Sequence, residues 1–307
     1  MTNKKCAPHK EYKDGSCFSL DELKIIAHNY NKSVDTKQVN GKKIDIKSND
    51  KKQLLNTIVK QLPQCNNDHI CIISQKFIIN KKLKNIFKPQ GTKGQYDWLS
   101  TLNINDVLRQ YELKYKDFKF GGAVPSDVFS YKKEERVDYP LMDTNLNIQH
   151  LDLHDLNIMG IKKIAFVYNL DKSYQSGSHW VALFCNLDKC QVYFFDSYGQ
   201  RPSKDIRSMI EKLANMCYNK HNTTCVKECN DLSVSQSFMM ETGKNKLEKL
   251  LSNIDYNRNR NQYKNTECGV YSINFIVQLL NGKKFKEIID NPISDEEINK
   301  LRKKYYR

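Results

Sequence analysis

The longest apolar pattern in the chain runs from Val270 to Leu280, with apolar side chains at most positions. This density predicts a helix that is buried around most of its circumference and ends near Asn281–Gly282. An Asn-rich loop precedes it, so Cys268 stands where loop becomes helix. The first turn of a helix has free N–H groups and a positive dipole end, which favour a nucleophilic thiolate. The alternative is a small buried cysteine of the core, the usual fate of a free thiol.

Two shorter apolar stretches, 177–184 and 192–198, are rich in aromatic and branched residues and predict strands. The polar segment between them predicts the turn of a hairpin. His179 begins the first strand and Asp196 ends the second, so both are expected at the same end of the sheet. A histidine beside a carboxylate is the base and orienter that a nucleophilic cysteine needs. Each residue also has a plain structural interpretation, as a strand-end histidine and a turn-forming aspartate.

The remaining patterns place further elements around this centre. Amphipathic spacing predicts helices, and branched apolar runs predict strands. The expected helices cover residues 20–30, 50–62, 202–218 and 294–305, and the expected strands cover 161–168 and 233–240. A linker rich in Gly, Pro and Lys at 87–94 divides the chain into an N-terminal helical accessory region, 1–90, and a larger domain, 91–307.

The N-terminal region allows several interpretations. Two helices joined by a lysine-rich loop resemble small SAP-type DNA-binding modules, and the alternative is a docking or adaptor element. Four potential zinc ligands also occur here, but their spacing fits no usual finger pattern, so scattered thiols and surface histidines are favoured. These four are Cys6, His9, Cys17 and His28. The same holds for the later group Cys217, His221, Cys225 and Cys229. We therefore expect no metal.

Composition adds constraints on compartment and partners. No apolar stretch is long enough to span a bilayer, and the polar N-terminus lacks a secretory signal, so we expect an intracellular or packaged protein. We accordingly expect its ten cysteines to be reduced thiols. The formal net charge of +15 is compatible with DNA or another polyanion as a partner, with the terminal 302–307 as one contact. A lysine-rich bias of an AT-rich genome, or a solvated helix terminus, explains the same residues.

Three short motifs together carry a resemblance to a known family. His179-Trp180, Phe195-Asp196-Ser197 and Gln262 followed after five residues by Cys268-Gly269 resemble the cysteine proteases related to the SUMO-specific proteases and the adenovirus protease. The resemblance implies Cys268 as nucleophile, His179 as general base and Asp196 as its orienter. It implies Gln262 as side-chain donor of the oxyanion hole. Glu267, where many relatives have Asp, is a departure from the pattern.

The resemblance extends over about residue 95 to the end and implies substrate-binding residues. Trp98-Leu99 resembles the family's opening segment, and Trp180 is expected to pack beside the catalytic imidazole. Gly121 and Gly122 lie in a segment similar to one in relatives from large DNA viruses, where it would border the substrate cleft. That segment also looks like a Gly-Gly-Ala cleavage site, but its expected place in the fold argues against self-cleavage after Gly122.

The implied fold is α+β, of the adenain and ubiquitin-like-protease type of papain-like fold. A central mixed sheet is flanked by helices, the nucleophile lies at a helix N-terminus, and a small mainly α region precedes the domain. The implied activity is that of a cofactor-free thiol protease acting after Gly-Gly-type sites, with the maturation of viral core or capsid proteins in the virion or host cytoplasm as the preferred role. The alternatives are an isopeptidase that removes SUMO or ubiquitin and a non-catalytic nucleic-acid-binding structural protein. No pattern indicates the oligomeric state.

Overall fold

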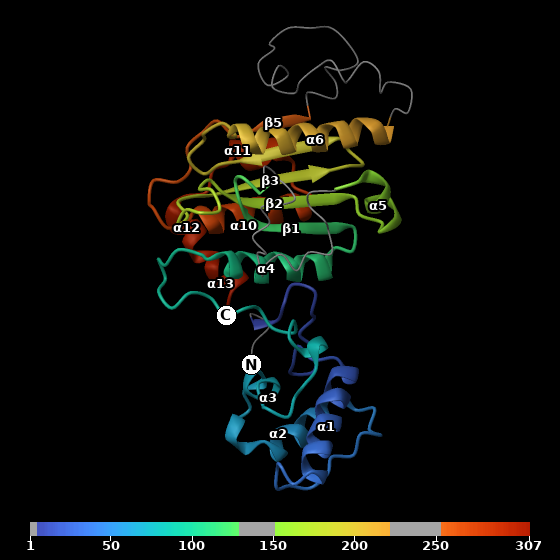
Figure 1. The fold of residues 1–307 in the computed structure, drawn as a ribbon. Coiled ribbons are helices and arrows are strands. Elements are labelled where there is room, and N and C mark those ends of the chain that lie inside the picture. The colour runs from blue at the N-terminus through green and yellow to red at the C-terminus, as the bar shows by residue number, and fades with distance from the viewer. Residues whose placement is uncertain (1–4, 129–150, 222–252) are drawn as a thin grey trace, which may run out of the picture. The chain divides into compact units, whose positions relative to one another are not determined.

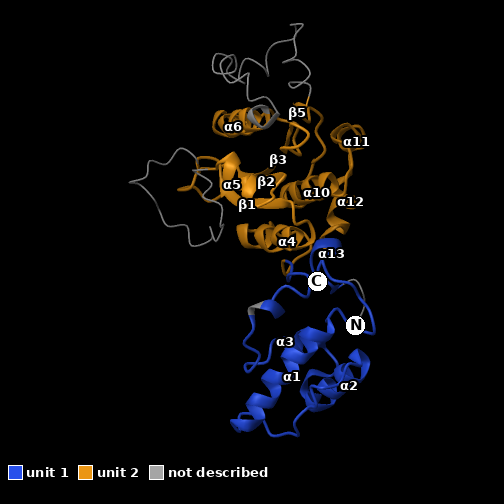
Figure 2. Ribbon diagram, turned by 90° about the vertical axis from the view of Figure 1, so that its right-hand side faces the viewer, with its two compact units in different colours: residues 1–91, 303–307 blue, residues 92–302 orange. Residues whose placement is uncertain are grey.

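The computed structural model describes residues 5–128, 151–221 and 253–307. The chain forms two compact units, 1–91 with 303–307 and 92–302, which are coloured separately in Figure 2. The expected strand over 233–240 and the cysteines at 225 and 229 lie outside the described residues.

The N-terminal unit is mainly helical, as the amphipathic patterns predict. Its helices are α1 (Leu20–Asp35), α2 (Lys51–Gln61) and α3 (His69–Ile73), with 3-10 turns η2 (Pro63–Cys65) and η3 (Lys81–Leu83). Ser19 caps α1 and accepts a hydrogen bond from the Glu22 N–H, while the Glu22 carboxylate accepts one from the Ser19 N–H. The apolar faces of α1 and α2 meet in one buried core. The helix α1 continues beyond its predicted end at residue 30 to Asp35, with Ser33 buried and its hydroxyl donating to the carbonyl of Tyr30.

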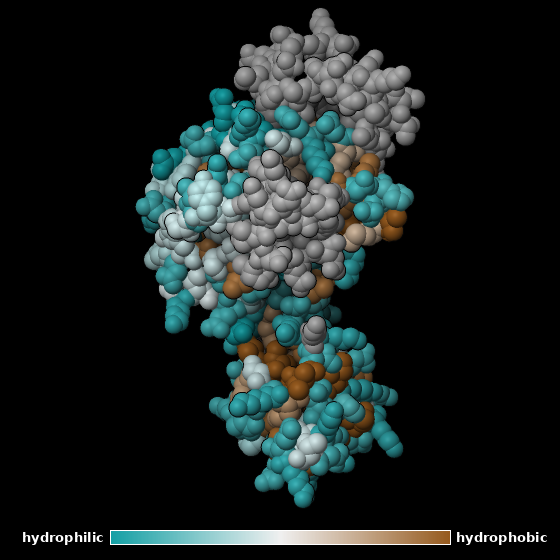
Figure 3. All heavy atoms as spheres, viewed as in Figure 1, coloured by the Kyte–Doolittle hydropathy of each residue, from teal (hydrophilic) through white to brown (hydrophobic). Residues whose placement is uncertain are grey.

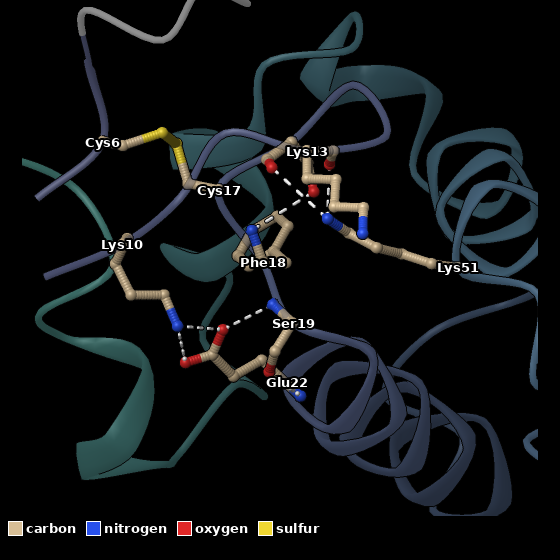
Figure 4. The surroundings of a disulfide bond; sticks show 9 residues. Cys6, Lys10, Lys13, Cys17, Phe18, Ser19, Glu22 and Lys51 are labelled. Atoms are coloured by element: carbon tan, nitrogen blue, oxygen red, sulfur yellow. Dashed lines mark hydrogen bonds and ion pairs between the residues drawn. A yellow bond between two sulfur atoms is a disulfide. The ribbon is translucent and has the colours of Figure 1, made fainter.

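The expectation of reduced thiols is wrong for this unit. Disulfides join Cys6 to Cys17 and Cys65 to Cys71, with Cα–Cα distances of 5.5 and 5.3 Å. Local turns bring each pair together, and in the first the chain reverses at Asp14–Gly15, both of which have positive φ. Figure 4 shows the first disulfide, which uses two of the four side chains considered as zinc ligands.

The end of the chain, residues 303–307, groups with this unit by its contacts. The Arg307 N–H donates to the carbonyl of Pro89 at 3.0 Å, and its guanidinium Nε donates to the carbonyl of Lys88 at 2.9 Å. The side chain of Tyr306 lies against Gly91. The short helix α13 (Arg302–Tyr305) therefore ends in contacts with the linker segment rather than as a free basic tail.

The larger unit is built on a five-stranded mixed sheet with the strand order β1-β2-β3-β4-β5 (Figure 1). The strands are β1 (Phe118–Pro125), β2 (Lys163–Asn169), β3 (Trp180–Asn186), β4 (Gln191–Phe195) and β5 (Ile254–Tyr256). The pairs β1–β2 and β4–β5 are parallel, whereas β2–β3 and β3–β4 are antiparallel. The hairpin expected from the two apolar stretches is thus β3–β4.

Helices cover both faces of this sheet, which explains why the central strands are apolar at nearly every position. Helix α6 (Lys204–His221) and the short α5 (Leu153–Ile158) pack against one face, and α10 (Cys268–Leu280) lies on the other (Figure 2). On the α10 face, the ring of Phe195 stacks on Phe275 with centroids 4.8 Å apart. Helix α4 (Thr101–Lys114) packs on β1, and α11 (Phe285–Asp290) and α12 (Asp295–Lys300) follow α10.

The surface agrees with the high lysine content. On the face drawn in Figure 3 the described part of the larger unit is mostly hydrophilic, while more apolar surface shows on the N-terminal unit. Among the described residues, no helix combines the length and the apolar character needed to cross a membrane.

Candidate active site

His179 and Asp196 meet at one end of the β3–β4 hairpin, as their places in the sequence predict. His179 directly precedes β3 and Asp196 directly follows β4, and the antiparallel register brings these ends together. The Nε2 atom of His179 lies 2.6 Å from Oδ1 of Asp196, and both side chains are buried. Such a short contact to a carboxylate is typical of a charge-assisted hydrogen bond.

Cys268 is the first residue of α10 and is buried at 3% exposure. Its sulfur interacts with the imidazole of His179. Because Nε2 of His179 is bonded to Asp196, the ring nitrogen left for the sulfur is Nδ1. Burial lowers the pKa of His179, but the hydrogen bonds and negative charges of Asp196 and Cys268 outweigh it and raise that pKa to about 9. The imidazolium is therefore the favoured state at neutral pH when the sulfur is a thiolate.

Gln262 is completely buried and lies on the loop that leads to α10. Its Oε1 accepts a hydrogen bond from the Ser197 hydroxyl at 2.7 Å, and its Nε2 donates to the carbonyl of Lys264. A carbonyl can only accept, so this contact determines which way the amide faces. In the part of the chain that the structure describes, the second N–H of Nε2 is left available as a donor.

A second set of contacts joins the turn after β4 to the loop that carries Gln262. Asn257 accepts from the Asp196 N–H at 2.8 Å and donates to the Asp196 carbonyl. The Ser197 carbonyl accepts from the N–H groups of both Asn261 and Gln262. Gly199, at φ +73°, lies so close to the backbone of residues 258–259 that a Cβ would come within 2.8 Å. Asp196 and Gln262 are therefore held by one hydrogen-bonded block, and the sequence motifs alone did not reveal Asn257.

Asp295 also holds the loop that carries Gln262, through hydrogen bonds to its backbone. Its Oδ2 accepts from the N–H groups of Tyr263 and Lys264 at 2.8 and 2.9 Å. The Tyr271 hydroxyl lies 3.3 Å from Oδ1 of Asp295 and donates to the carbonyl of Ile293 at 2.7 Å. Asp295 is the first residue of a capped helix far along the chain, so only tertiary structure indicates this role.

Glu267 has a structural reason to differ from aspartate. Its buried carboxylate accepts from Nδ2 of Asn299 at 2.7 Å and pairs with Nε of Arg302 at 3.2 Å. The longer side chain reaches these partners, and Glu267 makes no side-chain cap to α10 although it occupies the N-cap position. The N–H groups at the start of α10 are therefore not taken by the residue best placed to cap them.

Trp98 and Trp180 line the same groove, which has a volume of about 410 Å³. Trp98 is half exposed, whereas Trp180 is buried and its indole N–H donates to the carbonyl of Leu99 at 2.9 Å. The side chain of Leu99 packs on Gly269, where a Cβ would lie only 3.0 Å away. Leu99 thus connects the groove with the residue after Cys268 and explains the glycine at that position.

Gly121 and Gly122 are not among the residues that line this groove, although Val124 and Pro125 of the same strand are. Both glycines lie buried in β1. A Cβ on Gly121 would be 2.0 Å from Cε1 of Phe166, so packing accounts for this glycine. Gly122 has φ +113°, which favours glycine at the irregularity in the β1–β2 register. A role in bordering the cleft is therefore not needed to explain either residue.

Within the described ranges, no group of three or more His, Cys, Asp or Glu side chains is placed to hold a metal ion. A cysteine at a helix start, a histidine and a carboxylate in hydrogen-bonded sequence, and a nearby amide donor are the features of a thiol hydrolase. The fold and the site together define a cysteine protease.

Comparison with known proteins identifies the family. The model of the Ulp1 protease family, C-terminal catalytic domain, matches residues 162–307. A protein of Acanthamoeba polyphaga mimivirus that is named as a thiol protease is 33% identical over 98% of this chain and 93% of its own length. The chain belongs to the Ulp1 family of cysteine proteases.

Two further similarities involve African swine fever virus. A protein of that virus named as a SUMO-1 cysteine protease is 25% identical over 75% of this chain and 75% of its own length. The crystal structure of an African swine fever virus protease has a TM-score of 0.55 and 20% identity and covers 100% of this chain and 96% of the other. The second similarity establishes the α+β fold with its helical N-terminal region. The relatives named here are viral cysteine proteases, and proteins are the substrates of this family.

Proposed function

We propose that this protease matures viral core or capsid proteins by cleaving after Gly-Gly-type sequences, in the virion or the host cytoplasm. The observation that supports it best is the groove walled by Trp98 and Trp180, because Trp180 directly follows the proposed general base, His179. Two large aromatic walls suit a backbone without side chains. Maturation is preferred here because the relatives are viral, and the name of one of them, a SUMO-1 cysteine protease, keeps removal of SUMO or ubiquitin as the alternative.

The proposed reaction begins when His179 takes the proton of Cys268, giving a thiolate and an imidazolium. The thiolate attacks the carbonyl carbon of the scissile bond. The developing oxyanion accepts hydrogen bonds from the second N–H of Gln262 Nε2 and from the backbone N–H of Cys268. The Lys264 carbonyl takes only the other N–H of Gln262 Nε2, and the Glu267 side chain makes no cap hydrogen bond at the start of α10.

Breakdown of this intermediate needs the same imidazolium. His179 donates its Nδ1 proton to the leaving amine, the C–N bond breaks, and the acyl group stays on the sulfur. Water, deprotonated by His179, then hydrolyses the thioester and releases the acid. Asp196 holds the imidazole through Nε2 during both stages, so the ring needs no rotation.

An activity probe that ends in Gly-Gly tests this proposal. It should label the wild type and not Cys268→Ala, while Cys190→Ala, which removes another buried thiol, keeps the label. Labelling that persists in Cys268→Ala would remove this residue as nucleophile. Core-protein peptides with Gly-Gly sites, assayed beside fluorogenic SUMO and ubiquitin conjugates, separate maturation from deconjugation.

A second candidate interaction, with a polyanion, rests on a groove of about 780 Å³ at the opposite end of β3 from His179. The lysines that line it are Lys162, Lys163, Lys189, Lys283, Lys284 and Lys286. Asp117 and Asp188 already pair with Lys163 and Lys162, at 2.8 and 3.2 Å. In the described part of the chain, Lys189 and Lys286 have no such carboxylate partner, which leaves positive charge for phosphate groups.

Titration with a fluorescent oligonucleotide at several salt concentrations tests this interaction. Binding should weaken as salt rises, and Lys189→Glu with Lys286→Glu should reduce the salt slope by about two. A pair of charge reversals at Lys93 and Lys204, exposed lysines of the larger unit that do not line the groove, is the control. Affinity that ignores salt, or that falls equally in the control, contradicts a phosphate site in this groove.

A further inference from the structure

Tyr198 covers one face of the His179 imidazole. The two rings are nearly parallel, at an interplanar angle of 10°, and their centroids are 4.4 Å apart. Tyr198 is half-buried, so its ring separates the buried imidazole from solvent on that side. An imidazolium at this distance also gains a cation–π attraction that neutral imidazole lacks.

Tyr198 contacts the orienter of the histidine as well. Its backbone N–H donates to Oδ1 of Asp196 at 2.8 Å, the same oxygen that contacts Nε2 of His179. The turn is closed by the Gly199 N–H, which donates to the Asp196 carbonyl. One residue thus holds the carboxylate through its backbone and the imidazole through its ring.

Arg260 holds Tyr198 in turn. Its guanidinium lies over the Tyr198 ring at 5.1 Å and over the Tyr263 ring at 5.0 Å. Its Nε donates to the carbonyl of Gln262 at 2.7 Å, which anchors the side chain on the loop of the proposed oxyanion donor. The position of Tyr198 therefore depends on the same loop as Gln262.

We infer that Tyr198 is a positioning residue for His179 and that Arg260 maintains its stack on the imidazole. The Tyr198 ring holds the imidazole in the orientation in which Nε2 contacts Asp196 and Nδ1 faces Cys268. This orientation is needed while the proton moves from the sulfur to the leaving amine. It also stabilises the charged form of the ring. The charged and titratable groups around His179 in this arrangement are Asp196, Cys268, Tyr198 and, beyond the tyrosine, Arg260. The inference rests on the proposed roles of His179 and Cys268.

The test compares Tyr198→Phe, which keeps an aromatic ring, with Tyr198→Met, which keeps similar bulk without one. Tyr198→Met should lower kcat about tenfold with KM unchanged, because the imidazole is less well aligned, and Tyr198→Phe should retain most activity. In an NMR titration of the histidine side chains, the midpoint of His179 should fall by roughly half a pH unit in Tyr198→Met only. The His179 signal, one of seven, is assigned by its loss in His179→Gln.

The NMR titration needs no substrate, so it remains informative if the Gly-Gly preference is wrong. The inference would be overturned if the His179 midpoint stays unchanged in folded Tyr198→Met. It would also be overturned if Tyr198→Phe lowers that midpoint as much as Tyr198→Met does. If Tyr198→Met does not fold, Arg260→Met carries the test and should lower kcat several-fold. The matched control is the cation–π pair of Arg258 with Tyr256, the last residue of β5, where Tyr256→Met should leave the His179 midpoint as in the wild type.

Discussion

The Ser197 hydroxyl donates to Oε1 of Gln262 at 2.7 Å, across 65 positions of the chain. Ser197 directly follows Asp196, so the residue beside the orienter of the base also orients the proposed oxyanion donor. Both partners are almost completely buried, and neither is exposed to competing water. The alignment of base and oxyanion hole is therefore a single structural unit rather than two.

Removal of this hydroxyl should affect rate more than binding. We expect Ser197→Ala to lower kcat by about tenfold with little change in KM, a smaller loss than the roughly 10²–10³ expected for Gln262→Ala, because the amide keeps its contact with Lys264. Steady-state kinetics on a Gly-Gly peptide provide the measurement. A double variant as slow as Gln262→Ala alone would support action through Gln262, whereas multiplied losses would argue for independent roles.

The pH dependence of activity should report His179. Burial opposes the charged form, but Asp196 and Cys268 raise the pKa of His179 from 6.5 to about 9, so kcat/KM should decrease as pH rises through about 9. Asp196→Asn removes one of these partners, and the basic limb should then lie at lower pH. A basic limb that is the same in wild type and Asp196→Asn would show that another group controls it.

The same shift has a consequence for stability. Because the folded-state pKa of His179 is raised, its contribution is complete below pH 6.5 and is lost as pH increases toward about 9. The melting temperature of the wild type should therefore fall more over this pH range than that of His179→Gln. Equal slopes in the two proteins would contradict the assigned direction.

A substitution at Gly121 distinguishes two explanations for this glycine, internal packing and contact with the substrate. We expect Gly121→Ala to destabilise the larger unit by about 1–3 kcal/mol in denaturant unfolding, because its methyl group would meet the Phe166 ring. Phe166→Leu introduced in the same chain should recover part of the loss. If Gly121 borders the substrate instead, the single variant would increase KM and leave the unfolding transition in place.

The two disulfides predict a redox dependence confined to the N-terminal unit. Alkylation of the denatured protein without reductant should leave Cys6, Cys17, Cys65 and Cys71 unlabelled. Reduction should destabilise that unit by about 2–4 kcal/mol for each bond. The variant with Cys6→Ser and Cys17→Ser serves as the matched control, since reductant should have a smaller effect on it. Complete labelling before reduction would restore the expectation of free thiols.

Local sequence determined much of this protein. The density of apolar residues after Cys268 predicts a helix that needs burial on nearly all sides, and alternation of strand, turn and strand brings His179 and Asp196 to one end of a hairpin. These are short-range consequences of backbone periodicity, so they can be derived without the rest of the chain. The motif spacing supplied the family, the α+β fold and the enzyme class.

Only tertiary structure decided which residues support the site. Asn257, Asp295 and Arg302 reach the catalytic loops from segments whose local sequence predicts no role in the site, and their contacts depend on how separate elements pack. Packing also explains Gly121, because the Phe166 ring leaves no space for a side chain at this position. The disulfides likewise follow from Cα distances that turns create. Periodicity describes one element at a time, whereas these contacts are properties of pairs of elements that meet in space.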